Sequence, residues 1–246
     1  MTSRYRTPIA KINQSLKYRG NRFLKILISP QRPVVSSIDN SIYGASNNSD
    51  ISEHLHVLNF LIRMKKPEVL VELGTRGGES TRVFINALGE IGGQGYSVDL
   101  MPAPEFLNEL KYWTHFVGDD VVIGQMAKSE SRWPNGDNFK GIDFLFLDTS
   151  HEYDHTVEEI AAWWPLINPK GLLIFHDTNL TCNPTKLLSG GFTKGWDNKR
   201  GVTRAIEEYF GIQFNENSLT PLGKSDQIFV SLHVPWSNGL SIIQKM

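Results

Sequence analysis

The sequence predicts an α/β fold built on a doubly wound, mostly parallel sheet of seven strands with helices on both faces. Short apolar runs such as EVLVEL (68–73) and IDFLFL (142–147) recur along the chain, and segments with helical periodicity separate them. Such runs, linked by crossover helices, are typical of parallel strands buried on both faces. Near the end of the chain, two short segments flank a turn-rich link, which indicates a C-terminal antiparallel strand pair.

The expected elements follow one another in a regular order. We expect parallel strands at 68–73, 95–100, 114–118, 142–148 and 171–177. We expect helices at 51–62, 78–90, 104–112, 155–167 and 201–210. The antiparallel pair is expected at 211–217 and 225–234, on either side of the link TPLGKSD. This alternation of strands and helices accounts for most of the chain beyond residue 50.

Composition limits the kind of partner. The chain has 246 residues, 40% of them hydrophobic, which suffices for one sizeable domain with its own core. A formal net charge of −1 argues against nucleic acid as a partner and favours a small molecule. Cys182 is the only cysteine, and no apolar run is long enough to span a bilayer. We expect a cytoplasmic protein with no transmembrane segment.

The N-terminal part differs in charge from the rest. Its first 38 residues hold eight basic side chains and no acid: Arg4, Arg6, Lys11, Lys17, Arg19, Arg22, Lys25 and Arg32. Three interpretations remain open: an arm that packs on a neighbouring subunit or over the active site, a contact with a membrane surface or acidic partner, and a transit peptide. We predict a basic arm and loop at 1–50, a main domain at 51–246, and a homo-oligomer.

Polar residues gather where the first strands end. In VELGTRGGES (71–80) the first strand leads into a helix through a glycine-rich turn. Glycine allows close approach of a ligand, and the helix N-terminus presents free N–H groups to an anionic group. Asp99 ends the second strand, where an acid grips a ribose diol. The turn lacks the dinucleotide pattern G-x-G-x-x-G, so a nucleoside with a carboxylate tail fits better than a pyrophosphate.

These motifs resemble those of the class I S-adenosylmethionine-dependent methyltransferases, in particular the small-molecule O-methyltransferases of the catechol type. The resemblance lies in ELGTRGGES, in SVDLMP, and in GDD at 118–120. It implies a Rossmann-like fold and S-adenosylmethionine as cofactor. The resemblance places Gly74, Arg76, Gly78 and Ser80 around the methionine part, Asp99 at the ribose, and Asp119 or Asp120 at the adenine edge. Glu72, in the first strand, is a further candidate cofactor-binding residue.

The later stretch LDTSHEYDHTVEEIAAWWPLINPKGLLIFHDT is more specific. It resembles the bacterial branch that contains macrocin and mycinamicin sugar O-methyltransferases and the proteins labelled cephalosporin hydroxylase-like. The resemblance extends over about residues 50–210 and leaves the basic arm outside.

Two strands that we expect to be neighbours both end in an aspartate, Asp148 and Asp177. Neighbouring strands lie about 4.8 Å apart, so the two carboxylates repel unless a cation or proton lies between them. Mg²⁺ prefers such oxygen ligands, and Mn²⁺ is the alternative. A divalent ion held there would bind a substrate hydroxyl and lower its pKa.

Two histidines flank this pair. His151 follows Asp148 by three residues and is the candidate general base. The resemblance supports this role, because the catechol-type enzymes have a lysine at the corresponding place and the macrolide sugar branch a histidine. His176 stands where magnesium-binding relatives usually have an acid, and a histidine nitrogen is a poorer magnesium ligand than an oxygen. The candidate ligands are therefore Asp148, His176 and Asp177, with Mn²⁺ or a metal-free site left open.

A long glycine-rich segment, 178–201, follows Asp177 at the same edge of the predicted sheet. Long loops at this edge are commonly lids or substrate loops. The side chains that could contact an acceptor are Phe192, Lys194, Trp196 and Lys199.

Three functions remain open. The favoured one is metal-assisted O-methylation of a hydroxyl on a sugar, glycoside or phenolic natural product. The second is a non-haem iron oxygenase that uses His151, His176 and one aspartate, a two-histidine, one-carboxylate site. The third is a non-catalytic module that binds S-adenosylmethionine.

Overall fold

The computed structural model describes residues 40–46, 49–180, 182–183, 196–197, 200–213, 215 and 228–246. These residues all belong to one unit, Asp39–Met246. The predicted basic arm lies outside the described residues. Among the helices that are described, none combines the length and the apolar character needed to cross a membrane.

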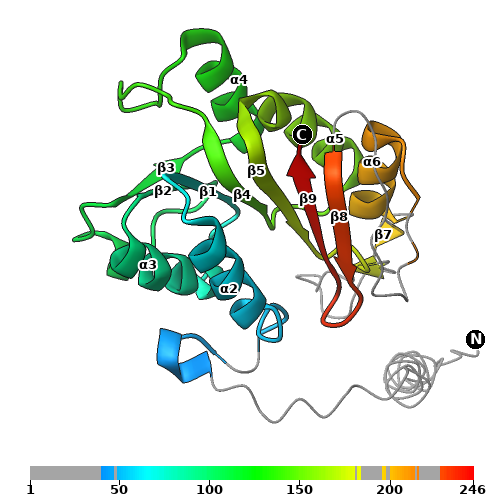
Figure 1. Ribbon diagram of the computed structural model, residues 1–246, viewed down its shortest axis with the longest axis horizontal. Coiled ribbons are helices and arrows are strands. Elements are labelled where there is room, and N and C mark those ends of the chain that lie inside the picture. The colour runs from blue at the N-terminus through cyan, green and yellow to red at the C-terminus, as the bar shows by residue number, and fades with distance from the viewer. Residues whose placement is uncertain are drawn as a thin grey trace, which may run out of the picture. The chain divides into compact units, whose positions relative to one another are not determined.

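A seven-stranded sheet forms the centre of the unit, in the order β3-β2-β1-β4-β5-β9-β8 (Figure 1). Its strands are β1 (Val69–Leu73), β2 (Gln94–Asp99), β3 (Trp113–Val117), β4 (Ile142–Leu147), β5 (Ile167–His176), β8 (Ile228–Val234) and β9 (Leu240–Lys245). The first five are parallel, and β9 and β8 are antiparallel additions beside β5. The predicted doubly wound fold is confirmed. Two residues each in β6 (Cys182–Asn183) and β7 (Trp196–Asp197) form a separate ribbon.

Helices cover both faces of the sheet. One face carries α2 (Leu55–Lys65) and α3 (Glu79–Ile91), and the other carries α4 (Asp120–Glu130), α5 (Tyr153–Trp163) and α6 (Gly201–Phe210) (Figure 1). Three short 3₁₀ helices lie between these elements: η1 (Asn40–Tyr43), η2 (Glu105–Leu107) and η3 (Trp164–Leu166).

Each face of the sheet has its own core, and β4 supplies both. Its fully buried Phe144 and Phe146 pack on the α2–α3 side, where Phe84 contacts both rings edge-on. The intervening Leu145 and Leu147 pack on the α4–α6 side with Trp163. Alternation of side chains in a strand explains this division, since successive residues point to opposite faces. The apolar run 142–147 therefore marks a strand covered by helices on both sides.

The structure contains one helix that the sequence analysis missed. The start of α4 is rich in β-branched residues, and Gly124 interrupts it, so its pattern is poor for a helix. The helix forms because Asp119 accepts a hydrogen bond from the Val122 amide at its N-terminus. Gly124 also allows close packing, because a Cβ there would lie 2.7 Å from the Trp163 ring.

Two other expectations about elements were wrong. The helix expected at 104–112 is only the single turn η2, in which Leu107 is the one buried residue. It therefore has no apolar stripe to pack. The antiparallel pair is confirmed, but its members are β8 and β9. Gly211, at the start of the segment expected as a strand, instead ends α6 in a left-handed conformation.

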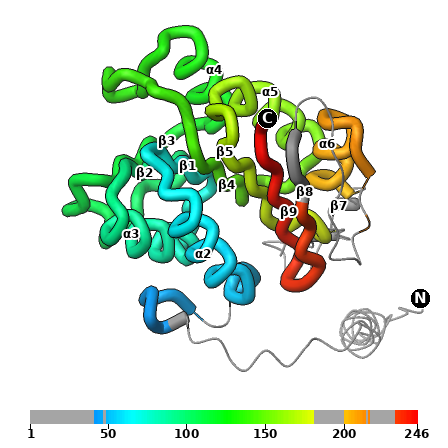
Figure 2. Tube along the Cα trace, in the orientation of Figure 1, coloured from blue at the N-terminus to red at the C-terminus, as the bar shows by residue number. Residues whose placement is uncertain are grey.

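The turn between β8 and β9 closes the sheet beside β5. It brings Ser237 and Asn238 next to the residues that follow β5, where the Asn179 amide donates to the Asn238 carbonyl at 2.6 Å. The Ser237 hydroxyl also donates to the carbonyl of Asp50. In the tube trace, β9 lies between β5 and β8 (Figure 2). The turn of the C-terminal hairpin therefore holds the segment that follows β5 in place.

Gly74 occupies the closest approach between two central strand ends. It adopts φ +83°, and a Cβ placed there would lie 2.1 Å from the carbonyl oxygen of Asp148. Glycine is therefore required both by the backbone conformation and by the neighbouring chain. Gly77, three residues later in the same turn, does not have a positive φ, and a Cβ added to it would meet nothing within 4 Å.

We expect Gly74→Ala to lower the free energy of unfolding by about 3 kcal/mol or more, because it adds both strain and a backbone clash. Gly77→Ala is the matched control, and its effect should stay within about 1 kcal/mol. Urea unfolding followed by circular dichroism measures both. Equal stabilities of the two variants would contradict this account of the turn.

Candidate functional site

Four ionisable side chains meet at the carboxyl edge of the sheet. The Nε2 atom of His151 lies 3.2 Å from Oδ1 of Asp148 and 3.0 Å from Oδ2 of Asp177. The Nδ1 atom of His176 lies 3.2 Å from Oδ1 of Asp148 and 3.5 Å from Oδ2 of Asp177. All four residues are buried. The candidate base and the three candidate metal ligands thus form one cluster.

The backbone holds two of these residues in unusual conformations. His151 has φ +62° and Asp177 has φ +55°, a left-handed region that non-glycine residues seldom adopt. Each conformation is unfavourable by about 1 kcal/mol or more and persists only where the surroundings enforce it. The two strained residues, His151 and Asp177, are therefore ones whose side chains contact each other in the cluster.

The carboxylates and imidazoles of the cluster shift each other's pKa values. Burial alone would raise the pKa of Asp148, but the imidazoles of His176 and His151 outweigh burial and hold it well below its ordinary value. Burial would likewise lower the pKa of His176, but the carboxylates of Asp148 and Asp177 raise it to about 10. In the protein alone, the His176 imidazolium therefore supplies the positive charge that the two carboxylates require.

The cluster also fits a divalent metal ion. One ligand atom each from Asp148, His151 and Asp177 lies within 4.8 Å of the others. Oδ1 of Asp177 is buried and has no hydrogen-bond partner among the described residues. A buried carboxylate oxygen without a hydrogen-bond partner, on a residue beside a second carboxylate, is available to a hard cation.

His54 supports this cluster from behind, and the sequence analysis gave it no role. Its fully buried ring meets the His176 ring edge-on, with centroids 5.4 Å apart. Its Nε2 atom lies 3.1 Å from the Ser237 carbonyl and so carries the proton. Burial, together with the nearby His176, lowers the pKa of His54 to about 3. A neutral ring therefore fixes the position of His176.

The predicted nucleoside turn is organised by Asp99. Its Oδ2 atom accepts the amides of Thr75 and Arg76 at 2.7 and 2.9 Å, and its Oδ1 atom accepts the amide of Met101 at 2.8 Å. Burial would raise the pKa of Asp99, but these N–H donors outweigh it and hold the pKa below its ordinary value. An ionised carboxylate thus links the end of β2 to the glycine-rich turn, where a ribose is expected.

Glu72 lies inside the protein beneath that turn. Both of its oxygens accept hydrogen bonds from the start of α3, one from the Ser80 hydroxyl at 2.5 Å and one from the Thr81 hydroxyl at 2.7 Å. Burial raises the pKa of Glu72 to about 8, although both hydroxyls oppose the shift. Glu72 and Ser80 therefore hold the turn in place rather than facing a ligand directly.

The other turn residues differ in exposure, since Gly78 is buried and Arg76 is exposed. Gly78, with φ +81°, begins α3, and a Cβ there would lie 2.4 Å from the Phe106 ring. The guanidinium of Arg82 stacks on the same ring, 3.9 Å from its centroid. Arg76 is exposed and pairs with Asp50 at 3.4 Å. Phe106, which the sequence analysis did not identify, therefore shapes the turn around the predicted methionine subsite.

The structure separates the two candidates for the adenine edge. Asp119 is exposed and caps α4, whereas Asp120 is buried and faces His155 at 3.2 Å. Only Asp119 lies where a ligand could reach it. Exposed apolar side chains surround this end of the sheet: Leu100, Met101, Val117 and Val122. An apolar rim beside a polar group is typical of sites for a flat heterocycle.

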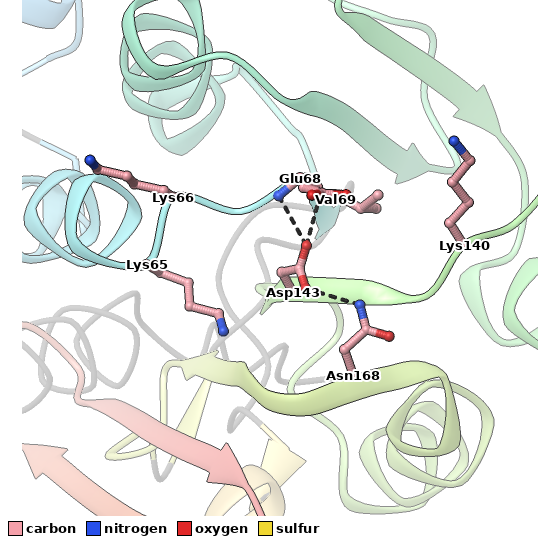
Figure 3. Close-up of a pocket in the computed structure, with 7 residues that line it drawn as sticks. All are labelled: Lys65, Lys66, Glu68, Val69, Lys140, Asp143 and Asn168. Carbon is pink, nitrogen blue, oxygen red and sulfur yellow. Dashed lines mark hydrogen bonds between the residues drawn. The ribbon is translucent and has the colours of Figure 1, made fainter.

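A pocket of about 340 Å³ lies at the opposite, amino end of the strands (Figure 3). There Asp143 accepts the amides of Glu68 and Val69 and a hydrogen bond from Asn168. These contacts join the starts of β1, β4 and β5. Ligands of parallel sheets bind at the carboxyl edge. We therefore regard this pocket as a structural feature of the sheet and not as the ligand-binding site.

The predicted acceptor loop is described only in part. The backbone of Trp196 lies in β7, while Phe192, Lys194 and Lys199 fall outside the described residues.

Comparison with known proteins agrees with this geometry. Residues 71–178 match the family described as "Methyltransferase domain". A rhamnosyl O-methyltransferase from Mycobacterium bovis is 24% identical over 144 residues, which cover 55% of this chain and 54% of that protein. The chain thus aligns with about half the length of this relative. Residues 71–178 therefore resemble a methyltransferase domain, as the sequence motifs indicated.

Solved structures share the fold. An O-methyltransferase from Bacillus cereus in complex with SAH matches with a TM-score of 0.56 at 13% identity, covering 93% of this chain and 97% of that chain. MycE methyltransferase, in complex with Mg, SAH and mycinamycin VI, matches with a TM-score of 0.54 at 16% identity, covering 84% and 52%. The predicted Rossmann-like fold is confirmed.

We expect Glu72→Gln to change how stability depends on pH. Glu72 binds its proton more tightly in the folded protein, with a pKa of about 8, than in the unfolded chain, where the value is 4.5. Its contribution to stability is therefore complete below pH 4.5 and is lost as the pH rises through 8. The variant should resemble wild type at low pH and exceed it by about 1–4 kcal/mol above pH 8.

Urea unfolding across this pH range measures the difference. Glu68→Gln, which changes an exposed acid four positions earlier, is the control and should follow wild type throughout. A constant offset between Glu72→Gln and wild type at all pH values would disprove the assignment.

Proposed function

We propose that this protein transfers a methyl group from S-adenosylmethionine to a hydroxyl of a small molecule, with assistance from a divalent metal ion. The observation that carries the proposal is the meeting of Asp148, Asp177 and His151 at the carboxyl edge, within 4.8 Å of one another. The edge continues into the glycine-rich turn, since Gly74 touches the carbonyl of Asp148. Donor and acceptor would therefore meet at one place.

The methyl donor would bind along the ends of β1, β2 and β3. The start of α3 offers backbone N–H groups to its carboxylate. Asp99 would accept the ribose hydroxyls, and Asp119 would lie at the adenine edge. Asp99 already receives three backbone hydrogen bonds, so a ribose would share or replace some of them. Binding of the donor is therefore expected to rearrange the turn at Thr75 and Arg76.

The acceptor hydroxyl would approach His151. Its Nε2 atom faces both aspartates, and from there it could remove the hydroxyl proton as the oxygen attacks the methyl carbon. Methyl transfer is a displacement at carbon, so positioning and deprotonation are the main contributions a protein makes. The buried setting of His151 keeps water away from the reacting atoms.

Asp148 and Asp177 would hold the metal ion, and His176 would lie beside them as a third ligand or as a positioned neighbour. A divalent ion at this place would lower the pKa of the bound acceptor hydroxyl. The mixed oxygen and nitrogen donors favour Mn²⁺ more than an all-oxygen site would. The magnesium in the MycE complex supports a metal in a protein of this fold.

Two of the relatives support a choice of acceptor class. The curated relative is named for rhamnosyl methylation and MycE was solved with mycinamycin VI. We therefore propose a hydroxyl on a sugar or glycoside as the first acceptor to test, with phenols as the next class.

The first experiment is a calorimetric titration of the protein with S-adenosylmethionine, in Mg²⁺, in Mn²⁺ and with a chelator. We expect micromolar binding, and Asp99→Asn should weaken it about 10-fold or more because a neutral amide accepts hydroxyl hydrogen bonds poorly. If the protein binds no S-adenosylmethionine under any of the three conditions, the proposed function is wrong. An assay for bound iron and oxygen consumption would then test the oxygenase hypothesis.

Variants of the charged cluster separate base from metal ligand. We expect His151→Gln to reduce kcat about 10²–10⁴-fold with the metal requirement unchanged. Asp148→Asn should abolish metal-dependent turnover and leave the Kd for S-adenosylmethionine unchanged. Glu152→Gln, at an exposed neighbouring position, serves as the control. Loss of cofactor binding in Asp148→Asn would show that Asp148 belongs to the cofactor site.

A further inference from the structure

A second group of ligand-type side chains lies outside the site described above. Asp120 is the first residue of α4, and His155 and Glu159 lie one turn apart on α5. One ligand atom from each lies within 4.8 Å of the others. The two helices pack against each other, since the Trp163 indole of α5 donates to the Asp120 carbonyl. The group is therefore part of a fixed helix–helix contact.

The spacing of the ligand atoms also suits coordination of a metal ion. The Nε2 atom of His155 lies 3.2 Å from Oδ1 of Asp120 and 3.7 Å from Oε1 of Glu159. The second distance is too long for a hydrogen bond. Ligand bonds of about 2.1 Å place neighbouring ligand atoms about 3.0–3.4 Å apart in octahedral or tetrahedral geometry. Small side-chain adjustments would bring all three atoms onto one ion.

The two buried carboxylates share one imidazole, that of His155, whose pKa is raised chiefly by its side-chain contact with Asp120. Asp120 and Glu159 are 7% and 1% exposed. Oδ1 of Asp120 is buried and receives no hydrogen bond of acceptable geometry from the described residues. Burial raises the pKa of Glu159 well above its ordinary value, and the Asp120 carboxylate raises it further, although the Thr149 hydroxyl opposes the shift. A cation would relieve both the burial and the repulsion.

We propose that Asp120, His155 and Glu159 bind a second divalent metal ion, separate from the one assigned to Asp148 and Asp177. One imidazole nitrogen with two carboxylate oxygens suits Zn²⁺ or Mn²⁺, with water completing the coordination. The His155 side chain is 28% exposed, so the ion and its water can enter from that side. The inference does not depend on methyl transfer.

The ion would link two parts of the proposed cofactor and reaction site. Asp120 directly follows Asp119, at the predicted adenine edge. Glu159 accepts the Thr149 hydroxyl at 2.7 Å, and Thr149 directly follows Asp148. An ion at this place would therefore hold the start of α4 against the loop that carries the reaction residues.

The test is a titration of the full chain with Zn²⁺ alone and Mn²⁺ alone, read by calorimetry and by the shift in melting temperature. Wild type should bind two ions. The double variant Asp148→Asn with Asp177→Asn should retain one. Glu159→Gln keeps an acceptor for Thr149 but removes the charge, and it should lose one ion, as should His155→Gln. Glu158→Gln, at an exposed neighbouring position, should bind like wild type.

The outcomes distinguish this proposal from the proposed function. If the double variant binds no ion, and neither metal raises its melting temperature, the second site does not exist. Two ions retained in both Glu159→Gln and His155→Gln would also overturn it. If wild type binds one ion that survives in the double variant and is lost in Glu159→Gln and His155→Gln, the second site stands and the metal assigned to Asp148 and Asp177 is wrong. Two variants guard against a failure of either one to fold.

Discussion

Asp148 and Asp177 are both buried at the ends of adjacent strands, and the repulsion between their carboxylates must be balanced by positive charge. The His176 imidazolium supplies that charge, and His151 also contacts both carboxylates. This arrangement requires the left-handed backbone at Asp177 and His151, because an ordinary strand continuation would direct the side chains elsewhere. The neutral ring of His54 and the C-terminal hairpin then fix His176 from behind.

A third carboxylate, Glu72, is buried one strand away, and its environment has the opposite effect. Burial raises its pKa to about 8, because its partners are two hydroxyl donors that only partly oppose the shift and no cation pairs with it among the described residues. Glu72 therefore favours the protonated form. Asp99, one strand further, receives three backbone amides and stays ionised. Along one sheet edge, the environment of each acid thus determines whether it carries charge. Glu72 is a protonated acid inside the fold, whereas Asp99 remains an ionised carboxylate at the strand end.

Sequence predicted the features that local pattern encodes. The strand ending at Asp148 and the strand ending at Asp177 could be found because an apolar run ends in a polar residue. The helix α4 was missed because its β-branched start favours a strand, and its stability comes from packing of Gly124 on Trp163, which no local pattern reveals. The role of His54 could not be predicted either, since its partner Ser237 lies 183 positions away.

The tertiary structure distinguishes Asp119 from Asp120, which the sequence motif does not. In the sequence, Asp119 and Asp120 are equivalent candidates for the adenine edge, because adjacent residues cannot be ranked by spacing alone. In the fold, they occupy the cap and the first turn of one helix, and their side chains diverge. Asp119 remains exposed beside the turn, whereas Asp120 joins His155 and Glu159 inside. A motif of two acids therefore divides into an exposed helix cap and a buried residue that ties α4 to α5, and the buried one has the imidazole of His155 as its partner.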